Sequence, residues 1–432
     1  MSQSIPTSLL RAFLPLVLIC VVLLMSGCGG GGGGDEDRSS TSSGNADPGQ
    51  APPPSYEPPP SDSNTGTGSP SLSPGDYASI QNCPLVGGSS AAEFKLLFIN
   101  LDSAPYFDEI VSDAIENQFG ALAPFVDYFS HFGFYTLETE GQANLGCEKG
   151  QDEAAFSCDN SKIHQAIAEQ CEVDDMQGII KVVIADMGYG ASGGEIIYLG
   201  SDRSWPDSSY ALQQLRNIVV HEVAHNFGLA DLYDGGINTD GSAVAGWPSE
   251  MSRQWANLDG PGCSKWCNNY KPASEYTQSA NASCATFTDR ASCTSFNRTD
   301  AGECKTADGD SYACCAWSED TTDDYFGSQC TPVWGTEDIG QDCLEGTGCF
   351  YGGAYGNNSW RPVKTWDDSI MYGAGHSEAF DTVSEQALRE AIRCCGTSDD
   401  STASCSAFRE TFNNFLLEYQ PYKSRIGSCG TR

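Results

Sequence analysis

The sequence predicts an α/β fold: a twisted mixed sheet that carries one long helix, with a cysteine-rich insertion. Apolar runs typical of buried strands alternate with segments of helical spacing between residues 94 and 227. Ten of the 20 cysteines then fall between residues 263 and 349, where little periodicity is visible. We therefore expect one domain in two parts, residues 83–262 and 350–432, separated by a disulfide-stapled insertion at 263–349.

The elements of this domain can be predicted in order along the chain. We expect a strand at 94–100, a helix at about 107–130, strands at 179–185 and 196–199 with a turn at 188–194 between them, a helix at 208–227 and a last helix at 383–392. The first and second strands are predominantly apolar, which is the pattern of strands buried on both faces. The third strand is shorter and is expected at a sheet edge.

The first 82 residues are expected to lie outside the fold. An apolar run at 12–25 follows a basic residue and is typical of a signal peptide, here residues 1–27. The letters LMSGC at 24–28 resemble a bacterial lipobox, so we expect lipidation of Cys28, with ordinary signal cleavage as the alternative. Residues 28–82 are rich in Gly, Ser and Pro and are expected to form a disordered tether.

Charge and cysteine content restrict the environment and the partners. The net charge is −36 with no basic cluster, which argues against a nucleic-acid partner. Without Cys20 and Cys28, 18 cysteines remain, an even number that fits nine disulfides in an oxidising compartment. We expect an exported protein, either a bacterial outer-membrane or cell-surface lipoprotein attached to the membrane by lipid, or one released to the medium.

The segment HEVAHNFGLAD at 221–231 is the strongest chemical signal. Histidines four residues apart project from one face of a helix, so His221 and His225 can bind the same metal ion. Glu222 is expected to act as a general base towards a metal-activated water. Gly228 can end the helix in a left-handed conformation and let Asp231 return as a third ligand. Three protein ligands leave a fourth position for water, as in catalytic zinc sites.

The pattern HExxHxxGxxD resembles the metzincin clan in its form with Asp as the third ligand. The motif itself is similar to those of immune inhibitor A and snapalysin. More of the chain resembles the bacterial IgA-protease-type zinc endopeptidases, through KLLFINLDSAPY, APFVDYFSHFGFYTLETEGQANLG, VVIADMGYGASGG, YGGAYGNNSWRP and SIMYG in that order. The resemblance implies a zincin-like catalytic domain, and Asp234 stays open as the alternative third ligand because spacing differs slightly in that family.

The same resemblance implies a Met-turn beneath the metal. Met371 in SIMYG is the favoured candidate and Met251 is the alternative. Tyr372 is a possible transition-state stabiliser, with a buried structural tyrosine as the other interpretation. The resemblance also implies that an extended substrate pairs with the segment Glu195–Tyr198 by strand addition.

Weaker signals are interpreted as structural. Asp234, Asn238 and Asp240 weakly resemble a calcium loop, although a solvated acidic loop explains them better, as it does Asp308 and Asp310. The other histidines, His131, His164 and His376, are expected to be structural.

Together these features predict a Zn²⁺-dependent endopeptidase that acts on proteins or peptides. Two alternatives remain open: a surface-anchored binding protein or adhesin on a zincin scaffold, and a zinc amidase acting on cell-wall peptides.

Overall fold

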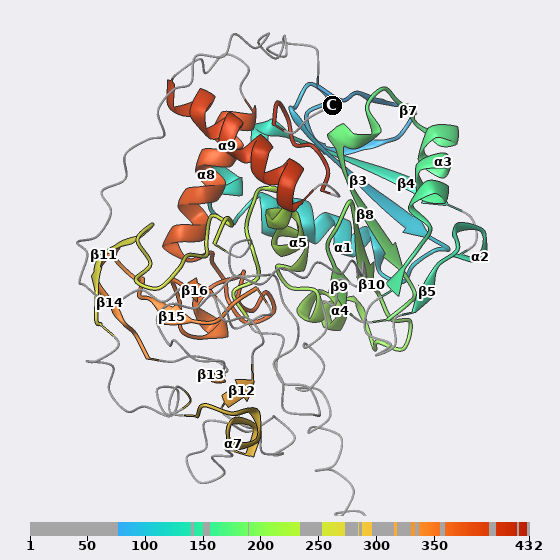
Figure 1. Ribbon diagram of the computed structural model, residues 1–432. Helices are drawn as coiled ribbons and strands as arrows, with labels where there is room; N and C mark the ends of the chain where they lie inside the picture. Colours follow the sequence, from blue (N-terminus) through green and yellow to red (C-terminus); the bar gives the residue numbers. More distant parts are fainter. Residues whose placement is uncertain are drawn as a thin grey trace, which may run out of the picture.

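The computed structural model describes residues 77–139, 142–149, 156–188, 190–233, 253–272, 284, 287–295, 315–317, 330–332, 337–354, 359–396, 403–420 and 423–429. Helices and strands mix within one α/β architecture (Figure 1). The helical segments are α1 Phe107–Asp113, η1 Ala114–Phe119, η2 Phe125–His131, α2 Gln142–Leu145, α3 Asn160–Gln170, η3 Met176–Gly178, α4 Ser208–Gln214, α5 Ile218–Asn226, α7 Arg290–Ser295, η6 Trp366–Asp368, α8 Thr382–Gly396 and α9 Ala403–Tyr419.

The strands of the main sheet follow the order β2-β4-β3-β8-β10-β9. They are β2 Leu85–Gly88, β3 Phe94–Leu101, β4 Phe132–Thr139, β8 Ile179–Ala185, β9 Ala191–Ser192 and β10 Ile196–Gly200. The four central strands run parallel, whereas β2 and β9 pair antiparallel at the two edges. The sheet is therefore mixed, as the alternation of strands and helices predicts.

Short two-stranded ladders complete the fold. They are formed by β1 Ile80–Gln81 with β7 Glu172–Val173, β5 Glu148–Lys149 with β6 Phe156–Ser157, β11 Cys267–Tyr270 with β14 Gly340–Cys343, β12 Cys315–Trp317 with β13 Cys330–Pro332, and β15 Phe350–Tyr351 with β16 Trp360–Arg361. The β1–β7 ladder shows that the folded part includes residues before Cys83, so the expected tether boundary at residue 82 is a few residues too late.

The central strands are buried on both faces. In β3, Leu96 and Phe98 face one hydrophobic cluster, while Leu97 and Ile99 face another. The first cluster lies between the sheet and the helices α1, α5, α8 and α9, and the second lies under α3 (Figure 1). This two-sided burial explains why β3 and β8 are predominantly apolar rather than alternating.

Two predicted helices are interrupted. The expected helix at 208–227 is divided into α4 and α5, because Asn217 adopts a left-handed conformation with φ 56°. The Asn217 side chain donates to the Ser377 carbonyl at 2.8 Å, a long-range bond that stabilises the break. The expected helix at 107–130 is divided into α1, a π-helical turn and a 3₁₀ turn that follows Pro124.

The last part of the chain is more helical than expected. Helix α8 extends four residues beyond the expected end at 392, and α9 was not expected at all. The two helices are linked by the Cys394–Cys405 disulfide. Both contribute residues to the core cluster over α5, so they close the face of the sheet on which the HEVAHNFGLAD segment lies.

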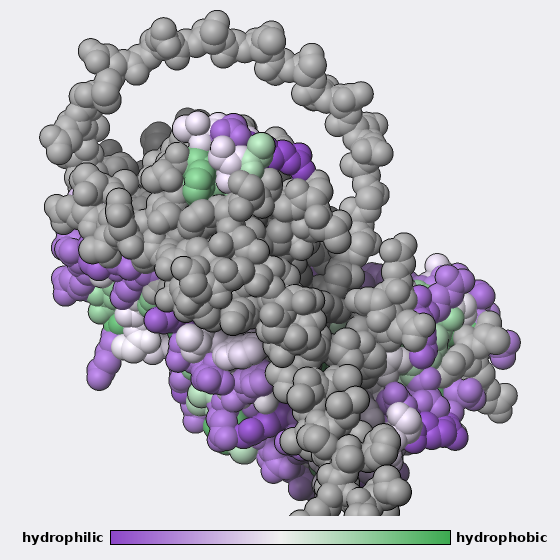
Figure 2. All heavy atoms as spheres, turned by 90° about the horizontal axis from the view of Figure 1, so that it is seen from below, coloured by the Kyte–Doolittle hydropathy of each residue, from purple (hydrophilic) through white to green (hydrophobic). Residues whose placement is uncertain are grey.

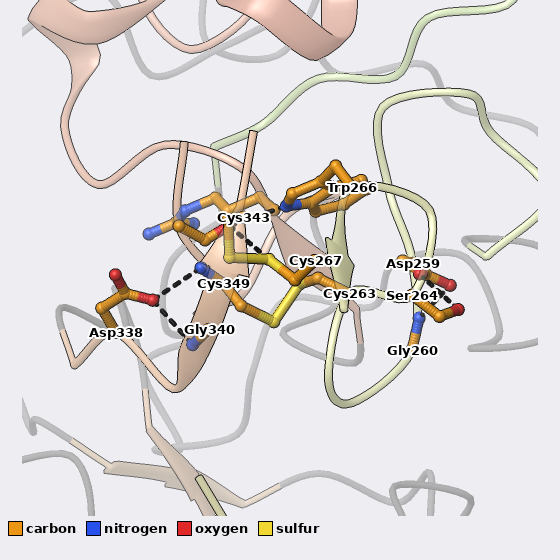
Figure 3. Close-up of a disulfide and its surroundings, with 12 residues drawn as sticks. Asp259, Gly260, Cys263, Ser264, Trp266, Cys267, Asp338, Gly340, Cys343 and Cys349 are labelled. Carbon is orange, nitrogen blue, oxygen red and sulfur yellow. Dashed lines mark hydrogen bonds between the residues drawn. A yellow bond between two sulfur atoms is a disulfide. The ribbon is translucent and has the colours of Figure 1, made fainter. Parts of the chain in front are cut away.

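The disulfides at the base of the cysteine-rich insertion join cysteines that both belong to the insertion. Cys263–Cys349 and Cys267–Cys343 lie side by side next to the β11–β14 ladder (Figure 3). Trp266 donates to the Gly348 carbonyl at 2.7 Å and belongs to a small cluster that reaches Val383 of α8. Further out, Cys293–Cys330 is also internal to the insertion. The base of the insertion is therefore fixed to the main domain by packing.

Seven disulfides join cysteines in the described parts of the chain: Cys83–Cys171, Cys147–Cys158, Cys263–Cys349, Cys267–Cys343, Cys293–Cys330, Cys394–Cys405 and Cys395–Cys429. This number indicates an oxidising, extracellular environment. The described surface in Figure 2 is mostly hydrophilic. No helix among the described residues is long and apolar enough to span a bilayer.

Candidate metal centre

Helix α5 carries both histidines of the motif. It lies under α8 and α9, and every residue from Val219 to Asn226 is buried. His221 and His225 are one turn apart, and their ring centroids are 5.0 Å from each other. Four apolar residues of α5 pack into the core and fix the rotation of the helix about its own axis: Val219, Val220, Val223 and Ala224. The two imidazoles are thereby directed to the same point.

Backbone carbonyls orient the two rings. His221 Nδ1 lies 2.8 Å from the carbonyl of Ile370, and His225 Nδ1 lies 2.8 Å from the carbonyl of Leu229. A carbonyl only accepts hydrogen bonds, so each Nδ1 carries a proton and each Nε2 is left as the atom with a free lone pair in the neutral ring. This is the arrangement that metal-binding histidines need.

The turn after α5 returns Asp231 to the histidines. Gly228 has φ 88°, which confirms the expected left-handed end of the helix. Asn257 makes two hydrogen bonds of 2.8 Å with the backbone of Ala230. Its Oδ1 accepts from the Ala230 amide, and its Nδ2 donates to the Ala230 carbonyl. Asn257 is fully buried. A residue that the sequence did not single out therefore fixes the backbone next to the third candidate ligand.

Two more segments hold the same turn from the other side. The Asp231 carbonyl accepts from the Ala354 amide at 3.0 Å, and the Leu232 amide donates to the Met371 carbonyl at 2.9 Å. The Arg361 guanidinium donates to the Leu232 carbonyl at 3.0 Å. These contacts bring the YGGAYGNNSWRP and SIMYG segments, more than 100 residues later in the chain, against the turn that carries Asp231.

His221, His225 and Asp231 form a group that can hold a metal ion, with one donor atom of each within 4.8 Å of the others. Asp231 Oδ1 lies 3.1 Å from His221 Nε2 and 3.4 Å from His225 Nε2. This oxygen is buried next to the two nitrogens. Of the two expected alternatives for the third ligand, Asp231 is thus brought to the histidines, and Asp234 lies outside the described residues.

The three groups are coupled electrostatically. Burial lowers the pKa of His221, but the hydrogen bond and the charge of Asp231 outweigh burial and raise it to about 9. Burial also opposes ionisation of Asp231, but the charge of His225 and hydrogen bonds to both histidines hold its pKa well below its usual range. The carboxylate of Asp231 therefore favours a proton on His221, and His221 in turn favours the ionised form of Asp231.

Glu222 lies beside the donor atoms. Its side chain is 1% exposed, and its Oε2 is 3.9 Å from His225 Nε2. The carboxylate also lies close to Gly193, in the loop between β9 and β10. A Cβ atom at position 193 would lie only 2.7 Å from Glu222 Oε2. A side chain at position 193 would therefore displace the Glu222 carboxylate.

The SIMYG segment packs against helix α5. Met371 is fully buried in the main core, and the preceding carbonyl is the one that orients His221. The ring of Tyr372 lies 4.6 Å from the Arg361 guanidinium carbon. The alternative Met251 lies outside the described residues. Met371 is thus in contact with the backbone of the site, while Tyr372 contacts the arginine that holds the ligand turn.

Lys423 is a residue of this site that the sequence did not indicate. It lies after α9, almost 200 residues beyond the motif, and its Nζ is 3.4 Å from the same Cβ position at Gly193. Burial lowers the pKa of Lys423 to about 8, although the charges of Glu222 and Asp231 act to raise it. No periodicity or spacing in the sequence connects this lysine to the histidines.

The remaining candidate residues are separate from the centre. His131 lies 3.1 Å from Glu93, His164 lies 2.9 Å from Glu195, and the exposed His376 stacks on Trp366. Strand β10 was expected at a sheet edge, but the two residues of β9 pair with it at Tyr198 and Leu199. Several other candidates lie outside the described residues: Cys28 and the residues considered for a calcium or solvated acidic loop, Asp234, Asn238, Asp240, Asp308 and Asp310.

Comparison with protein-family models and with curated proteins gives no match for this chain.

Proposed function

We propose that this protein is a zinc-dependent endopeptidase that hydrolyses peptide bonds of extracellular proteins. The observation that carries the proposal is the convergence of His221 Nε2, His225 Nε2 and Asp231 Oδ1 on one point, with the Glu222 carboxylate beside them. Two imidazoles and one carboxylate with an open fourth position form the donor set of a catalytic rather than a structural zinc site.

The donor geometry fits zinc. Zn–N and Zn–O bonds of about 2.0–2.1 Å in a tetrahedron place neighbouring ligand atoms about 3.3 Å apart. The two distances from Asp231 Oδ1 to the histidine nitrogens are 3.1 and 3.4 Å. The backbone bonds to both Nδ1 atoms supply the outer contacts that metal-binding imidazoles use. Zn²⁺ is therefore the metal we assign to this site.

Zinc, when bound, supplies a Lewis acid that activates a water molecule and polarises the scissile carbonyl. The protein's own residues do the rest. Asp231 and the two imidazoles hold the ion, while the Glu222 carboxylate is close enough to take a proton from the attacking water. The protonated Glu222 then donates this proton to the leaving amine. Burial of the site excludes bulk water and strengthens each of these electrostatic interactions.

The surrounding fold supports a zincin-like assignment. The motif helix lies against a mixed sheet, and a methionine turn packs under it with Met371 in the core. We infer a resemblance to the bacterial IgA-protease-type zinc endopeptidases, and the segments on which this inference rests include those that build the site. We also infer that the chain is exported and held to a membrane by lipid on Cys28, with protein or peptide substrates outside the cell.

The test is proteolysis of casein and of a peptide library by the purified protein, with and without a zinc chelator. We expect cleavage that the chelator abolishes and that added zinc restores. The variant Glu222→Gln keeps the shape of the side chain without the basic carboxylate. It should retain zinc and lose activity by about 10²-fold or more.

Other outcomes would identify the alternatives. Zinc binding without hydrolysis of any peptide would favour a binding protein or adhesin on this scaffold. Release of peptides from peptidoglycan, with no cleavage of casein or the library, would favour the zinc amidase.

A further inference from the structure

The carboxylate of Asp381 is buried at the N-terminus of α8, and both of its oxygens accept hydrogen bonds. Its Oδ1 accepts from the amides of Val383 and Ser384, each at 3.0 Å, and its Oδ2 accepts from the Ser369 hydroxyl at 2.7 Å. Burial raises the pKa of Asp381, whereas hydrogen bonds from the side chains of Ser384 and Ser369 and from the two α8 amides oppose this shift. Because these partners are all donors, they favour the ionised carboxylate.

A chain of hydrogen bonds leads from His221 to this carboxylate. The Ile370 carbonyl accepts from His221 Nδ1 at 2.8 Å. The N–H of the same peptide group belongs to Met371 and donates to Ser369 Oγ at 3.2 Å. The Ser369 oxygen also accepts from the Asp381 amide at 3.3 Å, so its single proton is directed to the Asp381 carboxylate. One peptide group and one hydroxyl therefore connect this imidazole with the anion.

A second chain leads from His225 to the same carboxylate. The Leu229 carbonyl accepts from His225 Nδ1 at 2.8 Å, and the N–H of that peptide group donates to Asn257 Oδ1 at 2.8 Å. Asn257 Nδ2 in turn donates to Ser384 Oγ at 3.4 Å, and the Ser384 hydroxyl donates to Asp381. This chain contains one group more and one long bond, so we expect it to be the weaker of the two.

All residues of both chains are buried, and in each chain every hydrogen bond is donated towards Asp381. Bonds arranged in this way polarise one another, and a low local dielectric strengthens them. An acceptor at Nδ1 fixes the imidazole ring and makes its other nitrogen a more basic metal ligand. We propose that Asp381 is a positioning residue of the metal centre, whose negative charge orients and polarises both histidines. The inference rests on the proposed zinc site and deepens it.

The test measures the zinc dissociation constant and the Nδ1–H signals of the two histidines by NMR, in the zinc-loaded and the metal-free protein. The chain holds only five histidines, so isotope labelling of histidine gives a simple spectrum. Asp381→Asn removes the charge and keeps a residue that caps helices equally well. Ser369→Ala interrupts the first chain alone, and Ser384→Ala interrupts the second. Asp159→Asn is the matched control, because it makes the same change at the N-cap of α3, over the second hydrophobic cluster.

We expect Asp381→Asn to bind zinc about tenfold less tightly, and we expect both Nδ1–H signals to move upfield because their hydrogen bonds weaken. Ser369→Ala should move the His221 signal and Ser384→Ala the His225 signal, each with a smaller loss of zinc affinity. Asp159→Asn should match the wild type in both measurements. The thermal midpoint shows which variants are folded.

Two results would overturn the inference. One is an unchanged zinc dissociation constant in a folded Asp381→Asn variant, and the other is a serine variant that moves both histidine signals equally. If Asp381→Asn does not fold, the two serine variants decide in the same way. If the wild type binds no zinc, the proposed function fails, and the Nδ1–H signals of the metal-free protein still show whether Asp381 acts on the two histidines.

Discussion

Gly193 offers the most specific test of how the Glu222 carboxylate is positioned. An alanine Cβ at residue 193 would lie 2.7 Å from Glu222 Oε2, whereas ordinary contacts begin near 3.4 Å. The next residue, Gly194, is a matched control because its nearest neighbour would be the Ile196 carbonyl at 3.6 Å. Both substitutions change the same backbone loop, and Gly193→Ala alone forces the carboxylate to move.

The size of the effect follows from these distances. The Glu222 carboxylate must move by about 0.7 Å to reach ordinary contact, and misplacing a catalytic group by about 1 Å costs on the order of 10²-fold in rate. We therefore expect Gly193→Ala to reduce kcat by about 10- to 100-fold. Zinc affinity should change little, because Glu222 is not among the three donor residues.

The assay measures kcat, KM and the zinc dissociation constant of both glycine variants. Gly194→Ala should retain most of the wild-type rate. The reasoning is refuted if the two variants have equal kcat values, or if Gly193→Ala loses zinc as readily as a ligand variant does.

Two further predictions concern stability. Burial lowers the pKa of Lys181 to about 8 from 10.5, and Glu195 only partly offsets this, so the folded protein binds fewer protons than the unfolded chain between these pH values. The free energy of unfolding should thus rise from pH 8 to 10.5, and Lys181 should contribute up to about 3 kcal/mol of this rise. Urea titrations at several pH values measure it, and the contribution of Lys181 should be missing in the Lys181→Met variant. The bridges Cys263–Cys349 and Cys267–Cys343 are nested, with sequence separations of 86 and 76, so opening the outer bridge alone frees a loop of only about ten residues. The double variant Cys263→Ser/Cys349→Ser should therefore lose about 2–3 kcal/mol, and a loss above about 4 kcal/mol would show that the inner bridge does not form independently.

Local sequence patterns predicted the elements that depend on local chemistry. Strands β3 and β8 are predominantly apolar runs because both faces are buried. Such a run can be recognised in the sequence without knowing which strands lie beside it. The i, i+4 spacing of His221 and His225 places them on one helix face wherever the helix lies. Gly228 ends that helix in the left-handed conformation that its residue type favours.

Long-range contacts account for what the sequence did not predict. The break between α4 and α5 depends on the bond from Asn217 to Ser377, which is 160 residues away. Asn257 acts on the ligand turn through the backbone of Ala230, and no spacing indicates this partner. Lys423 reaches the site only because a disulfide and bonds to the sheet edge hold the last segment in place.

The central claim is that His221, His225 and Asp231 together bind one catalytic zinc ion. Its most direct test is the zinc content and affinity of the wild type beside Asp231→Ala and Glu222→Gln. We predict one zinc ion per chain in the wild type and in Glu222→Gln, and loss of tight binding in Asp231→Ala. A wild-type protein that binds no zinc, or an Asp231→Ala variant that binds it as tightly as the wild type, would contradict the claim.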